Sequence, residues 1–205
     1  MKHTELLSAL TFISAGLLLV SLSTPAQAQR MDFAVGFNAM TAPPASDAEG
    51  NHAPVSLTGG LYPSFSAGFV MFKNLGFQGE FAWRGGRADW RGVQPYRPMF
   101  YDFNAMYQPR IAKGIYFEGL AGIGGMSTRF YTPTEICDPF VCHNYVTVNH
   151  FMGHFGAGIK AYPSKKIGLF VRPEAHLYLI HDNQEFSSGR AVRFGISLGY
   201  TFGER

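Results

Sequence analysis

The sequence predicts an all-β protein: an eight-stranded antiparallel up-and-down transmembrane β-barrel, preceded by an N-terminal signal peptide. Three observations lead to this prediction. Runs of alternating apolar and polar residues recur after residue 30, as expected for strands with two different faces. The connections between the runs alternate between long and short. Charged residues make up only 15% of the 205 residues, against roughly 25% in soluble domains.

The first part of the chain has the features of a targeting segment. A short polar start precedes an apolar stretch at 6–22, and Ala26-Gln27-Ala28 has the small-x-small form that signal peptidase cuts. An uncleaved membrane anchor is the alternative, because this stretch is near the lower length limit of a spanning helix. We expect a signal peptide at 1–28 and one outer-membrane β-barrel domain at 29–205.

Eight runs show the period of two that places alternate side chains on opposite faces of a sheet. They span 31–40, 60–72, 75–85, 99–109, 115–130, 148–162, 167–181 and 190–202. The long links between them lie near 41–59, 86–98, 131–147 and 182–189. In outer-membrane barrels the long loops face the outside and the short turns face the periplasm, so both termini are expected on the periplasmic side.

The two faces of these runs differ in chemistry. In the run 99–109, for example, Phe103 lies between Asp102 and Asn104. Across the eight runs we expect the apolar face to carry no Asp, Glu, Lys or Arg, and the other face is rich in Gly, Ser and Asn with a few charges. Small residues beside isolated charges indicate a crowded interior, and a charge on the lipid face costs about 2–4 kcal/mol at mid-bilayer. The apolar face is therefore predicted to contact lipid.

Two prolines fall within these runs, although a closed barrel has no free edge to accommodate a missing N–H. Pro63 lies near the end of its run, whereas Pro173 lies in the interior of the run 167–181. At Pro173 we expect a bulge or a missing hydrogen bond in the ladder.

The polar face gathers five acidic and four basic residues that we expect in the lumen. They are Asp32, Glu80, Arg84, Asp102, Glu118, Lys160, Arg172, Glu174 and Arg193. Buried charges must be paired, and an eight-stranded barrel has an interior just wide enough to be filled by side chains. These residues are therefore expected to form a salt-bridge network. A gated polar pathway for ions is the alternative.

The long links supply the candidates for surface recognition, since loops on a rigid scaffold usually carry function. The 86–98 link combines arginine with aromatic residues, a pattern suited to phosphate-bearing glycolipid or to a partner surface. These surface-loop candidates are Arg87, Trp90, Arg91, Tyr96 and Arg97. A solvated loop that leans on the outer leaflet is the plainer interpretation.

The two cysteines, Cys137 and Cys142, lie in one link. In an exported protein they predict a disulfide that closes a small loop, because a single C-x4-C pair lacks the ligand set of a zinc site. The histidines give no metal site either. His150 and His154 stand about 13 Å apart on a strand, and Glu174 with His176 lacks an evident third ligand. We expect no metal and no cofactor.

Catalysis would require a serine with a histidine and an orienting acid. The best cluster is Ser187-Ser188 with His181, Asp182 and Glu185, which is equally a polar turn. We therefore expect no enzyme, with a lipid A- or phospholipid-modifying barrel as an alternative.

The last run carries a family resemblance. Arg193-Phe194-Gly195, followed by Leu198, Tyr200 and Phe202, resembles the C-terminal insertion signal of outer-membrane barrels, which implies recognition by the barrel-assembly machinery. Here Gly203-Glu204-Arg205 follow the final aromatic residue, which departs from the usual form.

The stretch 150–202 resembles bacterial outer-membrane β-barrel domain proteins, notably in Val171-Arg172-Pro173-Glu174-Ala175-His176 and in Arg190-Ala191-Val192-Arg193. The resemblance covers the mature chain, implies a location in the outer membrane, and makes OmpA/OmpX-type barrels the nearest structural comparison. It implies no established activity.

From these observations we expect a non-enzymatic envelope scaffold or a protein that binds or adheres through its surface loops. A narrow channel for ions or small solutes is the main alternative. The expected partners are outer-membrane lipid or lipopolysaccharide and an extracellular ligand, with a monomeric barrel. A net charge of +3 is too small to indicate nucleic-acid binding.

Overall fold

The computed structural model describes residues 30–42, 57–90, 94–137, 142–164, 167–181, 186 and 189–203. The expected signal peptide at 1–28 lies outside these residues. Within the described ranges the elements are all strands. They are β1 (Arg30–Thr41), β2 (Leu61–Phe72), β3 (Leu75–Trp83), β4 (Ala88–Trp90), β5 (Gln94–Tyr107), β6 (Arg110–Ala112), β7 (Ile115–Cys137), β8 (Cys142–Ala161), β9 (Leu169–Ile180) and β10 (Arg190–Phe202).

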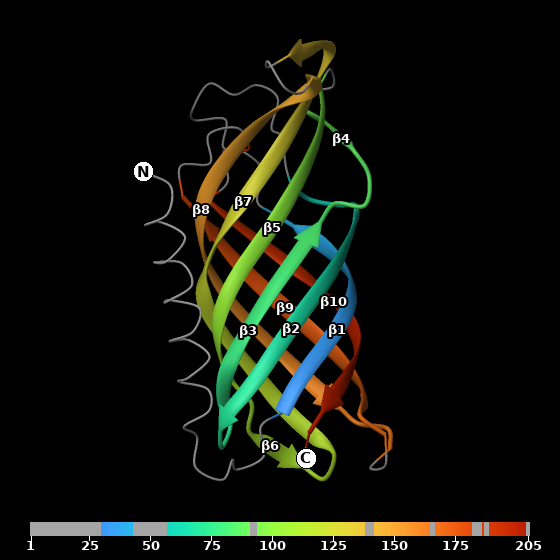
Figure 1. The fold of residues 1–205 in the computed structure, drawn as a ribbon, viewed down its shortest axis with the longest axis vertical. Helices are drawn as coiled ribbons and strands as arrows, with labels where there is room; N and C mark the ends of the chain where they lie inside the picture. Colours follow the sequence, from blue (N-terminus) through green and yellow to red (C-terminus); the bar gives the residue numbers. More distant parts are fainter. Residues whose placement is uncertain are drawn as a thin grey trace, which may run out of the picture.

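Eight of the strands in this part of the chain close into an antiparallel barrel, as the sequence predicted (Figure 1). The order around the ring is β5-β3-β2-β1-β10-β9-β8-β7, and pairing of β5 with β7 closes it. The first and last strands lie side by side, with Met31 opposite Phe202. The three-residue strands β4 and β6 pair only with β5 and β7, at opposite ends of the barrel.

Burial alternates along the strands with the apolar residues outside. In β1, Asp32 is 5% exposed, whereas its neighbour Phe33 is 37% exposed and Phe37 is 53% exposed. A soluble barrel would have the reverse arrangement. Because the strands pair into a closed ring, the barrel wall leaves no strand edge unpaired in hydrocarbon, as a membrane-spanning sheet requires. No helix in the described ranges is long and apolar enough to cross a membrane.

The ladder between β8 and β9 is interrupted at Pro173. Pairing runs from Met152 opposite Ile180 to Gly158 opposite Glu174, and resumes with Ala161 opposite Val171. The register is the same on both sides of the gap, so the strand loses ladder bonds without a bulge. Proline has no N–H to donate, which accounts for the gap.

The sequence placed the ends of three long strands wrongly. The segment 131–147 was expected as a loop, but β7 continues to Cys137 and β8 begins at Cys142, so most of it is a hairpin that projects past the other strands (Figure 1). Likewise, much of the expected loop at 86–98 is β4 and the start of β5. We call the end of the barrel with this hairpin the loop end, and the opposite end, with the 73–74 turn and β6, the turn end.

Candidate functional site

The lumen at the turn end is occupied by paired polar side chains. Lys160 forms an ion pair with Asp32, and Thr201 donates a hydrogen bond to the other oxygen of that carboxylate at 2.5 Å. Because the Thr201 hydroxyl hydrogen is committed to Asp32, the Tyr162 hydroxyl, 2.7 Å away, must donate to Thr201. Tyr162 lies just past the end of β8, and its burial raises the pKa of the phenol to about 12. It therefore stays neutral at physiological pH.

Arg172 lies at the centre of the next group of charges toward the loop end. Its Nη1 donates to Glu118 at 2.6 Å and its Nε donates to Glu174 at 2.6 Å. Its Nη2 donates to the hydroxyl of Ser66 at 3.0 Å, and Ser197 donates to Glu174 at 2.6 Å. One guanidinium on β9 is thereby bonded to side chains of β7, β9 and β2, and it ties together distant walls of the barrel.

Two stacked histidines lie next to this group, on its side toward the loop end. His154 Nε2 is 2.9 Å from His176 Nδ1, and the ring centroids are 5.1 Å apart. His154 Nδ1 is 2.6 Å from Asn104 Oδ1, while Asn104 Nδ2 donates to Asp102. Across the lumen Arg193 forms an ion pair with Glu80. These polar groups occupy the interior at the level of the two histidine rings.

An apolar cluster occupies the lumen from there to the loop end. Its aromatic members include Tyr62, Tyr96, Phe100, Phe130, Tyr178 and Phe186. Tyr96 was predicted on a surface loop, but it is only 1% exposed and its ring lies 5.1 Å from that of Phe186. The reason is that β5 begins at Gln94, which turns the side chain of Tyr96 inward.

The structure places eight of the nine predicted lumen charges inside the barrel, buried. Arg84 is the exception, because it lies beyond the end of β3 at the rim, half-buried, with its guanidinium 6.0 Å from the ring of Tyr62. A residue that the sequence analysis missed, Arg30, is buried at the turn end and donates to Gln108. The sequence signal that could have revealed Arg30 is its position directly before the run 31–40.

The outer surface at the loop end carries a separate group of arginines. Arg97 on β5 is paired in register with Arg129 on β7, and both are half-buried on the outside of the wall. Arg129 contradicts the expectation of an apolar face without charges, because it lies in the run 115–130 on the same face as Ile123, at the loop end of the strand. Arg97 donates to the carbonyl oxygen of Arg84 at 2.9 Å, and Arg129 lies 4.8 Å over the ring of Tyr145. Within the described chain no carboxylate forms an ion pair with either. Two like charges opposite each other destabilise a sheet unless something offsets them.

A pocket of about 400 Å³ lies in the same region. It is lined by Arg87, Gln94, Pro95, Tyr131, Thr132, Pro133 and Asn144. The guanidinium of Arg87 lies 3.8 Å over the ring of Tyr131, a cation–π contact that holds the arginine beside the pocket. Trp90 packs edge-on against Phe130, and Arg91 lies outside the described residues.

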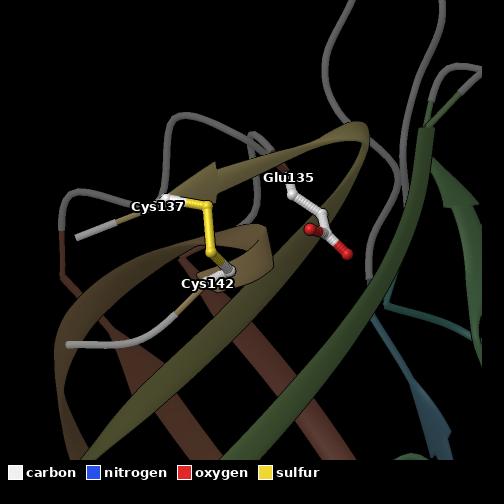
Figure 2. A group of neighbouring side chains, drawn as sticks. All are labelled: Glu135, Cys137 and Cys142. Atoms are coloured by element: carbon white, nitrogen blue, oxygen red, sulfur yellow. A yellow bond between two sulfur atoms is a disulfide. The ribbon is translucent and has the colours of Figure 1, made fainter. Parts of the chain in front are cut away.

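The projecting hairpin ends in a disulfide between Cys137 and Cys142, the predicted pair (Figure 2). Glu135 lies beside it, close enough for the three residues to resemble a metal-ligand group. Because both sulfur atoms are joined to each other, neither is a thiolate that could bind a metal. The serine cluster that the sequence offered for catalysis, Ser187-Ser188, lies outside the described residues.

Comparison with known proteins identifies the fold. No protein-family model and no curated protein sequence matches the chain. Among solved structures, the attachment invasion locus protein Ail of Yersinia pestis, in complex with the heparin analogue sucrose octasulfate, matches with a TM-score of 0.56 at 14% identity, over 85% of this chain and 99% of that one. Neisserial surface protein A matches with a TM-score of 0.58 at 8% identity, over 85% and 99%.

The N-terminal β-barrel domain of OprF from Pseudomonas aeruginosa matches with a TM-score of 0.50 at 14% identity, over 86% of this chain and all of that one. At these identities the likeness concerns the fold. Together with the apolar exterior, it settles the architecture. The chain has the fold of the small eight-stranded outer-membrane β-barrels, with an exterior suited to the bacterial outer membrane.

Proposed function

We propose that this chain is a non-enzymatic outer-membrane protein that binds anionic saccharide groups, phosphorylated or sulfated, at its loop end. The observation that carries the proposal is the pocket beside Arg87, together with the unneutralised pair Arg97 and Arg129 nearby. Planar guanidinium groups bind phosphate and sulfate through paired N–H donors. An anion at this surface would also offset the repulsion between the two paired arginines.

The filled lumen supports a binding role over transport. The apolar cluster occupies the loop end, and the charges below it bond to one another rather than line an open path. An eight-stranded barrel of this kind is closed by its own side chains. The complex of Ail with sucrose octasulfate lends support by analogy, because a barrel of the same fold takes a polyanionic saccharide.

The test uses the refolded barrel in neutral detergent, with sucrose octasulfate as the soluble probe and vesicles containing lipopolysaccharide as the membrane probe. Arg87→Gln combined with Arg129→Gln should weaken binding at least about tenfold, since a hydrogen bond to a charged group contributes about 1.5–3 kcal/mol. Arg110→Gln is the matched control, because Arg110 is exposed at the turn end.

Binding to the soluble probe alone would identify an extracellular glycan as the ligand class, whereas binding to vesicles alone would identify lipopolysaccharide. Equal binding by the double variant and the control would overturn the proposal. Ion conductance by the wild-type barrel in planar bilayers would favour the channel alternative instead.

A further inference from the structure

A series of hydrogen bonds in the lumen fixes the proton positions on the two stacked histidines. The Asn104 amide nitrogen donates to Asp102, so its oxygen is the atom that faces His154 Nδ1 at 2.6 Å. His154 Nδ1 must therefore carry the proton, which leaves His154 Nε2 as an acceptor in the neutral ring. The donor to that atom is His176 Nδ1, at 2.9 Å. In the neutral state His176 consequently presents an unprotonated Nε2 to the lumen.

That nitrogen faces two carboxylates. His176 is 1% exposed, and its Nε2 lies 3.7 Å from Glu174 Oε2 without a hydrogen-bond partner in the described chain. Glu80, 5% exposed, has an oxygen that is equally without a partner there. One ligand atom from each of the three residues lies within 4.8 Å of the other two. Glu174 Oε2 already accepts from Arg172, but His176 Nε2 and this Glu80 oxygen are acceptors left without a donor, which is unfavourable in a buried site.

The buried charges at this level are also out of balance. The described chain buries five carboxylates against four cationic side chains. The four are Arg30, Lys160, Arg172 and Arg193. The interior therefore carries one acidic side chain more than basic ones, an excess of negative charge that favours a bound cation.

We propose that Glu80, Glu174 and His176 form a binding site for a divalent transition-metal cation, with zinc as the best fit to one imidazole nitrogen and two carboxylate oxygens. The third ligand that the sequence did not reveal is Glu80. It comes from β3, which lies opposite β9 in the ring, so the ion cross-links opposite walls of the barrel.

The surroundings have the features of a supporting shell. The second ring nitrogen of His176 donates to His154, the arrangement that orients a metal-bound histidine. Arg193 holds Glu80, while Arg172 and Ser197 hold Glu174, so both carboxylates are fixed in place with lone pairs to spare. Because the apolar cluster covers the site from the loop end, the ion enters during folding rather than afterwards.

The test is refolding of the full barrel with Zn²⁺, followed by gel filtration in EDTA and measurement of zinc by mass spectrometry. Wild-type protein should retain about one zinc per barrel, and His176→Gln should retain less than about a tenth of that, because a site with one ligand removed no longer encloses the ion. His143→Gln is the matched control, since His143 lies on the projecting hairpin. A difference in electrophoretic mobility between unboiled and boiled samples confirms that each variant is folded.

If His176→Gln does not fold, X-ray absorption at the zinc edge of the wild-type protein decides. The proposal requires one imidazole nitrogen and carboxylate oxygens in the first shell, without sulfur. Wild-type barrel that refolds without retaining zinc would overturn the proposal. Zinc that persists in folded His176→Gln but is lost in His143→Gln would place the ion on the hairpin and overturn it equally.

Discussion

Arg172 Nη1 lies 2.6 Å from Glu118 Oε1, although the two residues are 54 positions apart in the chain. The contact joins β9 to β7 through the lumen rather than along the wall, and neither side chain is more than 2% exposed. It is thus a buried ion pair whose partners also bond to other groups. Removal of one partner of such a pair destabilises the fold, because the other partner is left charged and buried.

Arg172→Met should therefore destabilise the barrel by about 3–5 kcal/mol, because Glu118 and Glu174 lose their shared cation. Urea titration of the refolded barrel, followed by mobility of unboiled samples, measures the change. Arg110→Met serves as the control, since a change at an exposed site is expected to stay within about 0.5 kcal/mol. A similar midpoint for both variants would show that the lumen pairs are not important for stability.

Gly124 on β7 marks a place where the strands approach too closely for a side chain. A Cβ atom there would lie 2.0 Å from the carbonyl oxygen of Tyr101 on β5, which is backbone and cannot move aside. Gly124→Ala should cost about 1–3 kcal/mol through overpacking. Gly79→Ala, on the other side of β5, would place its Cβ in ordinary contact at 3.9 Å and should change the urea midpoint little. Equal effects at the two sites would contradict this account of the wall.

The disulfide should stabilise the projecting hairpin and contribute little to the stability of the barrel. Residues Pro133 to Cys137 are exposed beyond the barrel, so the hairpin has few buried contacts and low local stability without its cross-link. Cys137→Ser with Cys142→Ser should leave the urea midpoint within about 0.5 kcal/mol of wild type. Proteinase K should then cut between residues 131 and 147 faster than in the wild type. A large loss of barrel stability would mean that the hairpin is part of the core.

The architecture could be predicted because it depends on local alternation. The order Asp102, Phe103, Asn104 puts one side chain on each face in turn, and the structure has Phe103 60% exposed between two buried polar residues. The extent of the hairpin could not be predicted. Pro133 and Asn144 are typical loop residues, and pairing across a long hairpin depends on the partner strand.

The sequence predicts which side chains face the lumen, but it does not predict which of them contact each other. The alternation puts Glu80 and His176 on the inner face, yet it does not say which strands lie opposite each other. That depends on strand number, tilt and stagger around the closed ring. For the same reason the third candidate metal ligand was not apparent. Tyr96 was misplaced because Pro95 and Pro98, which are typical of loops, flank it at the start of β5.

The central claim, that the apolar face contacts lipid, is tested most directly by a nitroxide label at Phe103→Cys in lipid vesicles. The native cysteines are joined in their disulfide, so the label attaches to the new thiol. Thr134 on the hairpin provides the aqueous reference position. Our account predicts that the label at 103 collides more often with oxygen than with a water-soluble nickel chelate, and that the label at 134 shows the reverse. Preferential collision with nickel at 103 would contradict it.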